Sequence, residues 1–226
     1  MAVITVSREY GSRGEEITQQ VAKELGYSYF DKDILADVAR IANTTEDEIR
    51  QYDEKEEHGL HSFLKKLFVA QPLVVAEFPY YYPPTMPLDW SIGPIENEPR
   101  LDPESVTAFF NQVLEELWRR DNVVIVGRGS QKILASKPRT LHVRFVGTIQ
   151  DRCKQVRADD SLNHVEAAKK ILAIDKGRAH YLKHHHDADW SDATLYHLVI
   201  NTSLVPVGQA VKIVTQAIYR AEDRSD

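Results

Sequence analysis

The chain has 226 residues, 42% of them hydrophobic, and its 28 Lys and Arg against 34 Asp and Glu give a formal net charge of −6. This composition can build a sizeable core and argues against a disordered or fibrous protein. The charge has the wrong sign for binding nucleic acid through the overall field of the molecule. Any phosphate must therefore be bound by locally clustered Arg and Lys.

Cysteine content and hydropathy bear on the compartment. The single cysteine, Cys153, excludes an internal disulfide framework and favours a reducing compartment. No apolar run reaches the roughly 18 residues of a membrane span. The first residues lack the basic and apolar segments of a signal peptide. We therefore expect a soluble cytoplasmic protein, and the length predicts one α/β domain with an inserted or appended subdomain.

The first 30 residues have the pattern of an α/β fold. Residues 3–7 predict a strand, and the glycine-containing loop of residues 9–14 follows it. From Gly14 apolar residues recur at helical spacing up to Gly26, which stands where a C-terminal cap is expected. Residues 27–30 predict a second strand. A strand, glycine loop, helix and strand in this order are typical of a parallel sheet.

The middle of the chain is less regular. Residues 31–69 predict helical segments, whereas six of the ten prolines lie within residues 79–101. A loop of that length is commonly functional or an oligomer contact, and a tolerated surface insertion is an equal alternative. Asp102-Pro103-Glu104 is a strong helix start. Further along, strands are predicted over residues 123–126, 141–146 and 198–200, and a last helix over residues 207–220.

The loop after the first strand is a candidate anion site. Backbone N–H groups and the positive end of the next helix attract anions such as phosphate. The loop does not match the nucleotide-binding motif G-x-x-x-x-G-K-[ST], because Gly14 stands in the place of the lysine and Glu15 in that of the hydroxyl residue. An ordinary strand-to-helix turn is the alternative on these residues alone.

Arginines follow two later strands. In open α/β sheets ligands bind outside the carboxyl ends of the strands. Arg128, flanked by two glycines, is therefore a candidate for bidentate phosphate contact, with a solvated loop as the alternative. The segments after residue 146 are rich in basic residues that either lie across a phosphate chain or form solvated helix faces: Arg152, Lys154, Arg157, Lys169, Lys170, Lys176, Arg178 and Lys183.

The histidine run His184 to His186 is expected to have a structural or solvent role. Three adjacent histidines cannot all face one ion on a regular element, and no second pair of ligands lies nearby at metal-site spacing. Nucleophilic catalysis has no support, because Cys153 lacks an activating motif and no G-x-S-x-G element is present.

Taken in order, these segments resemble the cytidylate kinase-like family, which is related to the nucleoside monophosphate kinases. The resemblance covers nearly the whole chain except about residues 50–105. The matching stretches are residues 4–12, Leu25-Gly26, residues 29–32, residues 124–129, Asp175-x-x-Arg178-x-x-Tyr181, Trp190-x-Asp192 and residues 196–202.

The resemblance implies a three-layer α/β/α fold of the P-loop kinase type with a five-stranded parallel sheet. Residues 1–226 would form a single kinase-like domain. Within it, residues 46–101 would form a helical NMP-binding-type insert that is divergent here and includes the Pro/Tyr-rich loop. Residues 158–192 would form a lid-like segment. The implied partners are small-molecule nucleotides, with no nucleic acid and no membrane. A homo-oligomer through residues 79–101 is an additional hypothesis.

The implied reaction transfers the γ-phosphoryl group of ATP, with Mg²⁺, to a nucleoside monophosphate or a similar small phosphorylated acceptor. Carried over by position, the residues that bind ATP would be Arg8, Gly11, Ser12, Arg13, Gly14 and Glu15. The acceptor would be bound by Asp31, Lys32, Arg128 and Arg157, and the catalytic residues would be Arg128, Arg152 and Arg178, with no protein ligand for a metal.

Departures from the family pattern leave two functional hypotheses open. The phosphate loop lacks the lysine of cytidylate kinases, and Gly129 replaces the aspartate that follows the arginine there. A carboxylate of Glu15 or Glu16 would repel a phosphate charge by about 4 kcal/mol at 4 Å and an effective dielectric of 20. The protein is accordingly an active phosphotransferase, or a nucleotide-binding pseudoenzyme or regulatory module without turnover.

Overall fold

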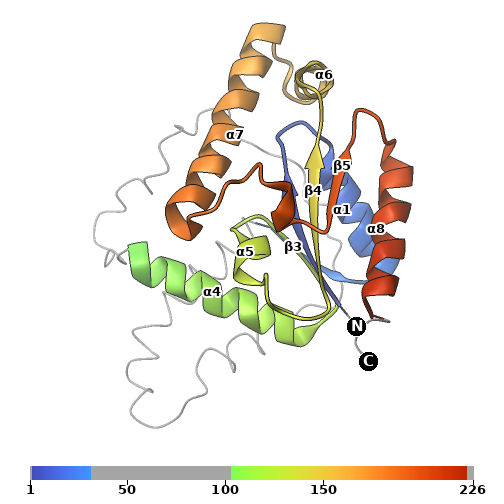
Figure 1. The fold of residues 1–226 in the computed structure, drawn as a ribbon. Helices are drawn as coiled ribbons and strands as arrows, with labels where there is room; N and C mark the ends of the chain where they lie inside the picture. The colour runs from blue at the N-terminus through green and yellow to red at the C-terminus, as the bar shows by residue number, and fades with distance from the viewer. Residues whose placement is uncertain (1, 32–102, 223–226) are drawn as a thin grey trace.

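The computed structural model describes residues 2–31 and 103–222, and these form a parallel sheet covered by helices (Figure 1). All strand pairings are parallel, and the strand order is β2-β3-β1-β4-β5. The five-stranded parallel sheet expected from the resemblance is therefore confirmed. The strands are β1 Val3–Arg8, β2 Ser28–Phe30, β3 Val123–Val126, β4 Thr140–Val146 and β5 Leu198–Asn201.

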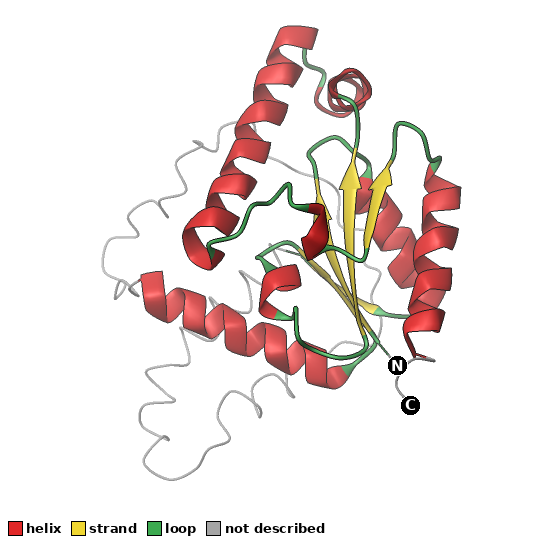
Figure 2. Ribbon diagram, in the orientation of Figure 1, coloured by secondary structure: helices red, strands yellow, loops and turns green. Residues whose placement is uncertain are grey.

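Helices lie on both faces of the sheet (Figure 2). α1 and α8 pack together on one face, and α4, α5 and α7 lie on the opposite side (Figure 1). Their bounds are α1 Gly14–Leu25, α4 Pro103–Arg120, α5 Ser130–Ile133, α6 Ile149–Asp160, α7 His164–His186 and α8 Val207–Glu222, with a 3₁₀ turn, η1, at Ala193–Leu195.

The main hydrophobic core lies between the sheet and the pair α1 and α8. Alternate residues of β1, such as Ile4 and Val6, point into it and meet Val21 of α1 and Val214 of α8. Burial of this area removes apolar surface from water and is the main stabilising contribution of the fold. Strand periodicity thus orients one face of β1 toward these two helices.

The opposite face of β1 and β4 is buried but polar. Thr5 pairs in register with His142, and Ser7 pairs with Arg144. All four side chains are buried. Buried polar groups need partners, so this face of the sheet is organised by hydrogen bonds as well as by apolar packing.

The strands and helices predicted from the sequence agree with the structure within the described residues. The expected strands over 123–126, 141–146 and 198–200 correspond to β3, β4 and β5, and the helix expected after Asp102 is α4. The proposed insert over residues 46–101 lies outside the described residues. Within the described part of the chain, no helix combines the length and hydropathy that crossing a membrane requires.

Candidate functional site

The carboxyl ends of the parallel strands carry the candidate site. Ligands bind at this edge in open α/β sheets because the loops after adjacent strands converge there. The loop of residues 9–13 follows β1, and the loop of residues 127–129 follows β3. Val6 of β1 pairs with Val126 of β3, so the two loops leave the sheet side by side.

The loop after β1 ends in a helix start that lacks a side-chain cap. Arg13, the N-cap of α1, is in the left-handed region at φ 57°, and its side chain makes no capping hydrogen bond to this end of the helix. The first N–H groups of a helix have no partner within it, and the helix dipole makes this end positive. Together these features make the start of α1 suited to an anion.

Two glycines allow the loop to lie against its neighbours. A Cβ at Gly14 would lie 2.7 Å from Arg8 Cβ and 2.9 Å from Phe145 Cβ. Gly11 has φ +76°, and a Cβ there would lie 2.9 Å from the carbonyl oxygen of Arg152. All three distances are shorter than the contacts that a real Cβ makes, so the loop conformation requires glycine at these positions.

A cavity of about 330 Å³ opens beside this loop. Arg152 and Lys154 of α6 contribute positive charge to its wall. Among the described residues of the lining, the acidic one is Asp151, whose pKa is lowered to about 2 by hydrogen bonds from Lys154, Thr148 and Ser203. The lining residues are Gly11, Ser12, Arg13, Asp151, Arg152, Lys154, Gln155, Thr202 and Ser203. The cavity wall thus suits a ligand that carries an anionic group and is otherwise polar.

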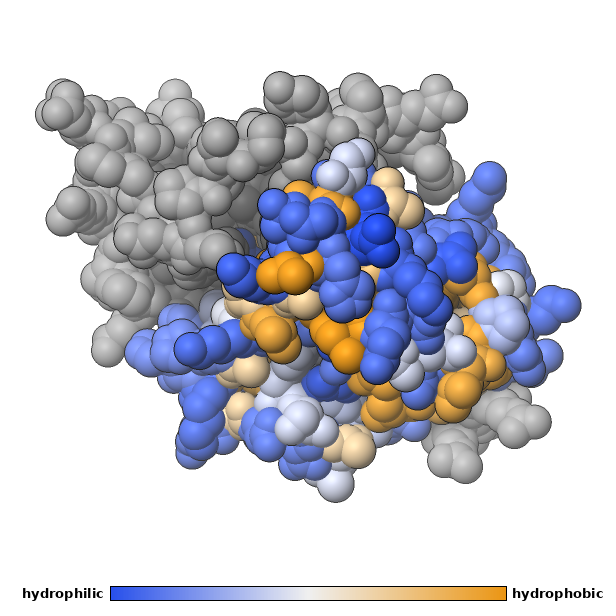
Figure 3. Space-filling view, turned by 90° about the horizontal axis from the view of Figure 1, so that it is seen from above, coloured by the Kyte–Doolittle hydropathy of each residue, from blue (hydrophilic) through white to orange (hydrophobic). Residues whose placement is uncertain are grey.

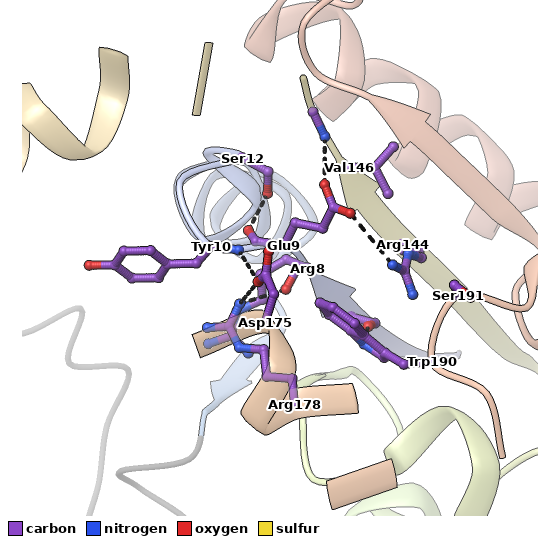
Figure 4. A network of polar contacts seen from close by, with 12 residues as sticks. Arg8, Glu9, Tyr10, Ser12, Arg144, Val146, Asp175, Arg178, Trp190 and Ser191 are labelled. Carbon is purple, nitrogen blue, oxygen red and sulfur yellow. Dashed lines mark hydrogen bonds and ion pairs between the residues drawn. The ribbon is translucent and has the colours of Figure 1, made fainter. Parts of the chain in front are cut away.

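Glu9 joins the first loop to β4 (Figure 4) and to the start of α6. Its Oε2 accepts a hydrogen bond from the Gly147 N–H at 3.0 Å and lies 3.4 Å from Arg152 Nε. Its Oε1 lies 3.7 Å from Arg144 Nη2. With a backbone donor and two guanidinium groups around it, the Glu9 carboxylate fixes loop positions and is not directed at the cavity as a free charge.

Asp175 of α7 is a second carboxylate that holds the loop. It accepts the Tyr10 N–H at 2.9 Å and pairs with Arg152 Nη1, and Arg178 Nη1 lies 3.8 Å from it. Arg178 also donates to the Arg8 carbonyl oxygen at 2.6 Å (Figure 4). Helix α7 is therefore attached to the loop after β1 by several charged hydrogen bonds, which are stronger than neutral ones.

Arg144 is buried between aromatic rings behind this network. Its guanidinium carbon lies 4.3 Å from the centre of the Trp190 ring and 5.5 Å from that of Tyr196. Trp190 Nε1 donates to Ser7 Oγ at 2.7 Å. Cation–π contacts of this kind stabilise a desolvated arginine. The aromatic residues thus hold the cation that faces Glu9.

The loop after β3 is closed on one side by the end of α7. Gly127, Arg128 and Gly129 all have positive φ. Burial raises the pKa of the Tyr181 hydroxyl, and Arg128, which shares a hydrogen bond with it, acts in the opposite direction. A Cβ at Gly129 would lie 2.5 Å from His186 Nε2. The missing side chain at residue 129 therefore leaves the space that the His186 ring occupies.

The residues assigned by resemblance are only partly brought together. Arg8 and Arg178 lie in one network (Figure 4). Arg152 joins this network through Asp175 and the Tyr10 carbonyl oxygen, and Gly11 lies against the Arg152 backbone. Arg13 is exposed and forms a bidentate pair with Glu16, and Arg157 is exposed on α6. Ser12 Oγ donates to the Glu9 carbonyl oxygen at 2.7 Å. Glu15 begins α1, Asp31 follows β2, and Lys32 lies outside the described residues.

Sequence reasoning gave no role to Glu9, Arg144 or Asp175. Glu9 and Asp175 lie within stretches that carry the family resemblance, whereas Arg144 lies within a predicted strand. A charged residue in a strand that is otherwise apolar is the available signal for Arg144, because a charge at such a position is rarely buried without a partner. Its partners lie far away in the sequence.

One residue of the histidine run at the end of α7, His186, packs against the loop after β3. Burial lowers the pKa of His186, which packs on Gly129. Across residues 2–31 and 103–222, no cluster of three or more His, Cys, Asp or Glu side chains is placed to hold a metal ion.

On the outer face at the α6 end, hydrophilic side chains predominate, with hydrophobic ones in small groups (Figure 3).

Known structures resemble this fold. An uncharacterized protein from Eubacterium ventriosum ATCC 27560 matches with a TM-score of 0.65 and 20% identity over 97% of this chain and 98% of that chain. A shikimate kinase from Bacteroides thetaiotaomicron gives a TM-score of 0.45 and 11% identity over 96% and 98%. A gluconokinase from Sinorhizobium meliloti 1021 gives 0.47 and 13% over 98% and 94%. At such similarity the two kinases indicate nothing about the substrate of this chain.

Family membership rests on the sequence match. A comparison with curated proteins found no significant match. A model of the cytidylate kinase-like family matches residues 3–204, which is most of the chain and includes every loop of the site described above. The chain belongs to the cytidylate kinase-like family.

Proposed function

We propose that this protein binds ATP at the start of α1 and transfers its terminal phosphoryl group to a nucleoside monophosphate or a similar small phosphorylated acceptor. The observation that carries the proposal is the uncapped, positive helix start beside a cavity lined by Arg152 and Lys154. Membership of the cytidylate kinase-like family supports the same reading. Polyphosphate fits the site, because N–H donors and basic side chains surround it.

ATP would be held by the loop of residues 11–14, with its remaining atoms in the cavity between α6 and the loop after β5. Magnesium commonly binds to nucleotide phosphates and keeps several waters. It would therefore enter on the nucleotide, where it neutralises phosphate charge. We also propose the cytoplasmic location expected from the single cysteine.

The acceptor would lie at the loop after β3, where Arg128 supplies a guanidinium at the carboxyl edge of the sheet. In the transfer, the bond between the terminal phosphorus and its bridging oxygen breaks while an acceptor phosphate oxygen forms a bond to that phosphorus. ADP leaves with the electron pair of the broken bond. The protein contributes position and positive charge, which are the main requirements of phosphoryl transfer.

Arg152 and Arg178 would contact the phosphates while retaining part of the network described above. A guanidinium has five N–H donors, so the observed contacts with Asp175, Glu9 and the loop carbonyls do not use all of them. Their engagement with carboxylates also supports a second candidate function, a nucleotide-binding module without turnover. The absence of the motif lysine at residue 14 favours the same alternative.

A coupled assay with Mg²⁺ and ATP against a panel of nucleoside monophosphates tests the proposal. We expect turnover with at least one acceptor and a loss of at least 100-fold for Arg128→Ala, which removes a charge-assisted phosphate contact of a few kcal/mol. Arg139→Ala removes the same charge at the opposite edge of the sheet, where Arg139 pairs with Asp121, and should retain turnover. Ligand-dependent thermal stabilisation without turnover of any acceptor would establish the second candidate instead.

A further inference from the structure

The arginines of the network differ in how their charge is balanced. Arg144 and Arg152 lie 3.7 Å and 3.4 Å from Glu9, and Arg178 lies 3.8 Å from Asp175. Arg8 has no carboxylate within ion-pair distance among the described residues, and its Nε is buried without a hydrogen-bond partner there. The structure thus contains a partly buried guanidinium whose charge no described side chain balances.

Arg8 extends from one loop of the site to the other. Its Cβ lies 2.7 Å from the position of a Cβ at Gly14, in the loop after β1. Its Nη1 lies 3.3 Å from the position of a Cβ at Gly127, in the loop after β3. The two glycines leave room for the stem and for the end of the same side chain. Its guanidinium therefore lies between the proposed donor and acceptor loops.

A partly buried guanidinium without a partner lowers the stability of the folded state when no ligand is bound. A buried donor that lacks a partner destabilises the folded state by about 1–3 kcal/mol, and more when it is charged. Natural proteins retain few such groups, and a missing ligand is one reason for an exception. A phosphate, which accepts several hydrogen bonds from a guanidinium, would balance both the charge and the donors.

We propose that Arg8 binds the phosphoryl group in transit and supplies, from the end of β1, the positive charge that the motif lysine provides in a G-x-x-x-x-G-K-[ST] loop. This inference rests on the proposed function. Arg13, the basic residue within the loop, is less suited to this role because it is exposed. Its Nε and Nη2 donate hydrogen bonds to the Glu16 carboxylate at 2.8 Å and 2.9 Å. In this role Arg8 would contact the phosphates of both the donor and the acceptor.

The test measures binding of inorganic tripolyphosphate by thermal shift and calorimetry, so that it does not depend on turnover. Wild type should be stabilised by the anion. Arg8→Met should bind it at least tenfold more weakly, and Arg8→Lys should lie between the two, because lysine keeps the charge but not the fork. Arg139→Met is the matched control and should bind like wild type.

The same experiment distinguishes this role from a structural one. Without ligand, Arg8→Met should unfold at the wild-type temperature or above it, since Arg8 forms no ion pair with any residue in the described part of the chain. Equal binding by wild type and Arg8→Met, or no binding by wild type, would overturn the role of Arg8. If tripolyphosphate binds through Arg8 but no acceptor is phosphorylated, phosphate binding by Arg8 stands and the proposed transferase activity is wrong.

Discussion

Among single residues, His142 shows how the polar face of the sheet is stabilised. Its Nδ1 lies 2.6 Å from Thr5 Oγ1, its ring stacks on His197 at 4.8 Å, and its Nε2 is buried without a partner among the described residues. Burial, with a smaller contribution from His197, lowers its pKa from 6.5 to about 4. The fold therefore holds this imidazole in its neutral form.

Stability should consequently fall as the pH decreases through this range. Between pH 6.5 and 4 the unfolded chain binds the proton and the folded chain does not, so the contribution of His142 is complete above pH 6.5 and lost by about pH 4. The loss should reach about 2 kcal/mol at pH 5. Urea unfolding at pH 7 and pH 5 measures it. His142→Leu, which cannot titrate, should lose most of this dependence, and an unchanged dependence would contradict the assignment.

The charged residues of the site were harder to predict than the strands that carry them. The apolar pattern of residues 141–146 predicts β4, but the same pattern contains Arg144, whose partners are Glu9 and Trp190. Ion pairs that join residues more than 100 positions apart depend on strand order and helix placement. Sequence spacing does not determine these, so the pairing of the arginines could not be foreseen.

At the level of elements, α7 connects the two loops of the site. It begins in a capping box, in which the Asn163 side chain accepts the Val165 and Glu166 N–H groups and Glu166 accepts the Asn163 N–H. Its middle holds the first loop through Asp175, and its end packs on Gly129 through His186. The contacts of its far end could not be foreseen from the sequence, because they depend on the missing side chain at residue 129.

Two glycine substitutions should have opposite effects on stability. Gly14→Ala places a Cβ within 3 Å of Arg8 and Phe145, so we expect a loss of about 1–3 kcal/mol and impaired phosphate binding. Gly177→Ala, on α7, meets no atom within 4 Å, so we expect a gain of about 0.5–1 kcal/mol from helix propensity. Urea unfolding compares them. Equal stability of the two variants would show that the loop does not require glycine.

The whole molecule has a net charge of −6, yet its site is basic. The two are compatible because arginines that are far apart in the sequence lie together at the carboxyl edge of the sheet. Arg8 ends β1, Arg128 follows β3, Arg152 lies on α6 and Arg178 lies on α7. The order of predicted strands and helices, together with the family resemblance, predicted this edge as the site. It did not predict that two carboxylates, Glu9 and Asp175, would organise the arginines there.

The proposed function requires that nucleotide phosphates bind to the loop at the start of α1. Hydrogen–deuterium exchange with and without Mg²⁺ and ATP tests the location directly, because it reports amide protection along the chain. We predict that ATP slows exchange in residues 9–17 and in the start of α6, the segments that flank the cavity. Unchanged exchange in residues 9–17 at saturating ATP, or protection confined to other segments, would contradict the claim.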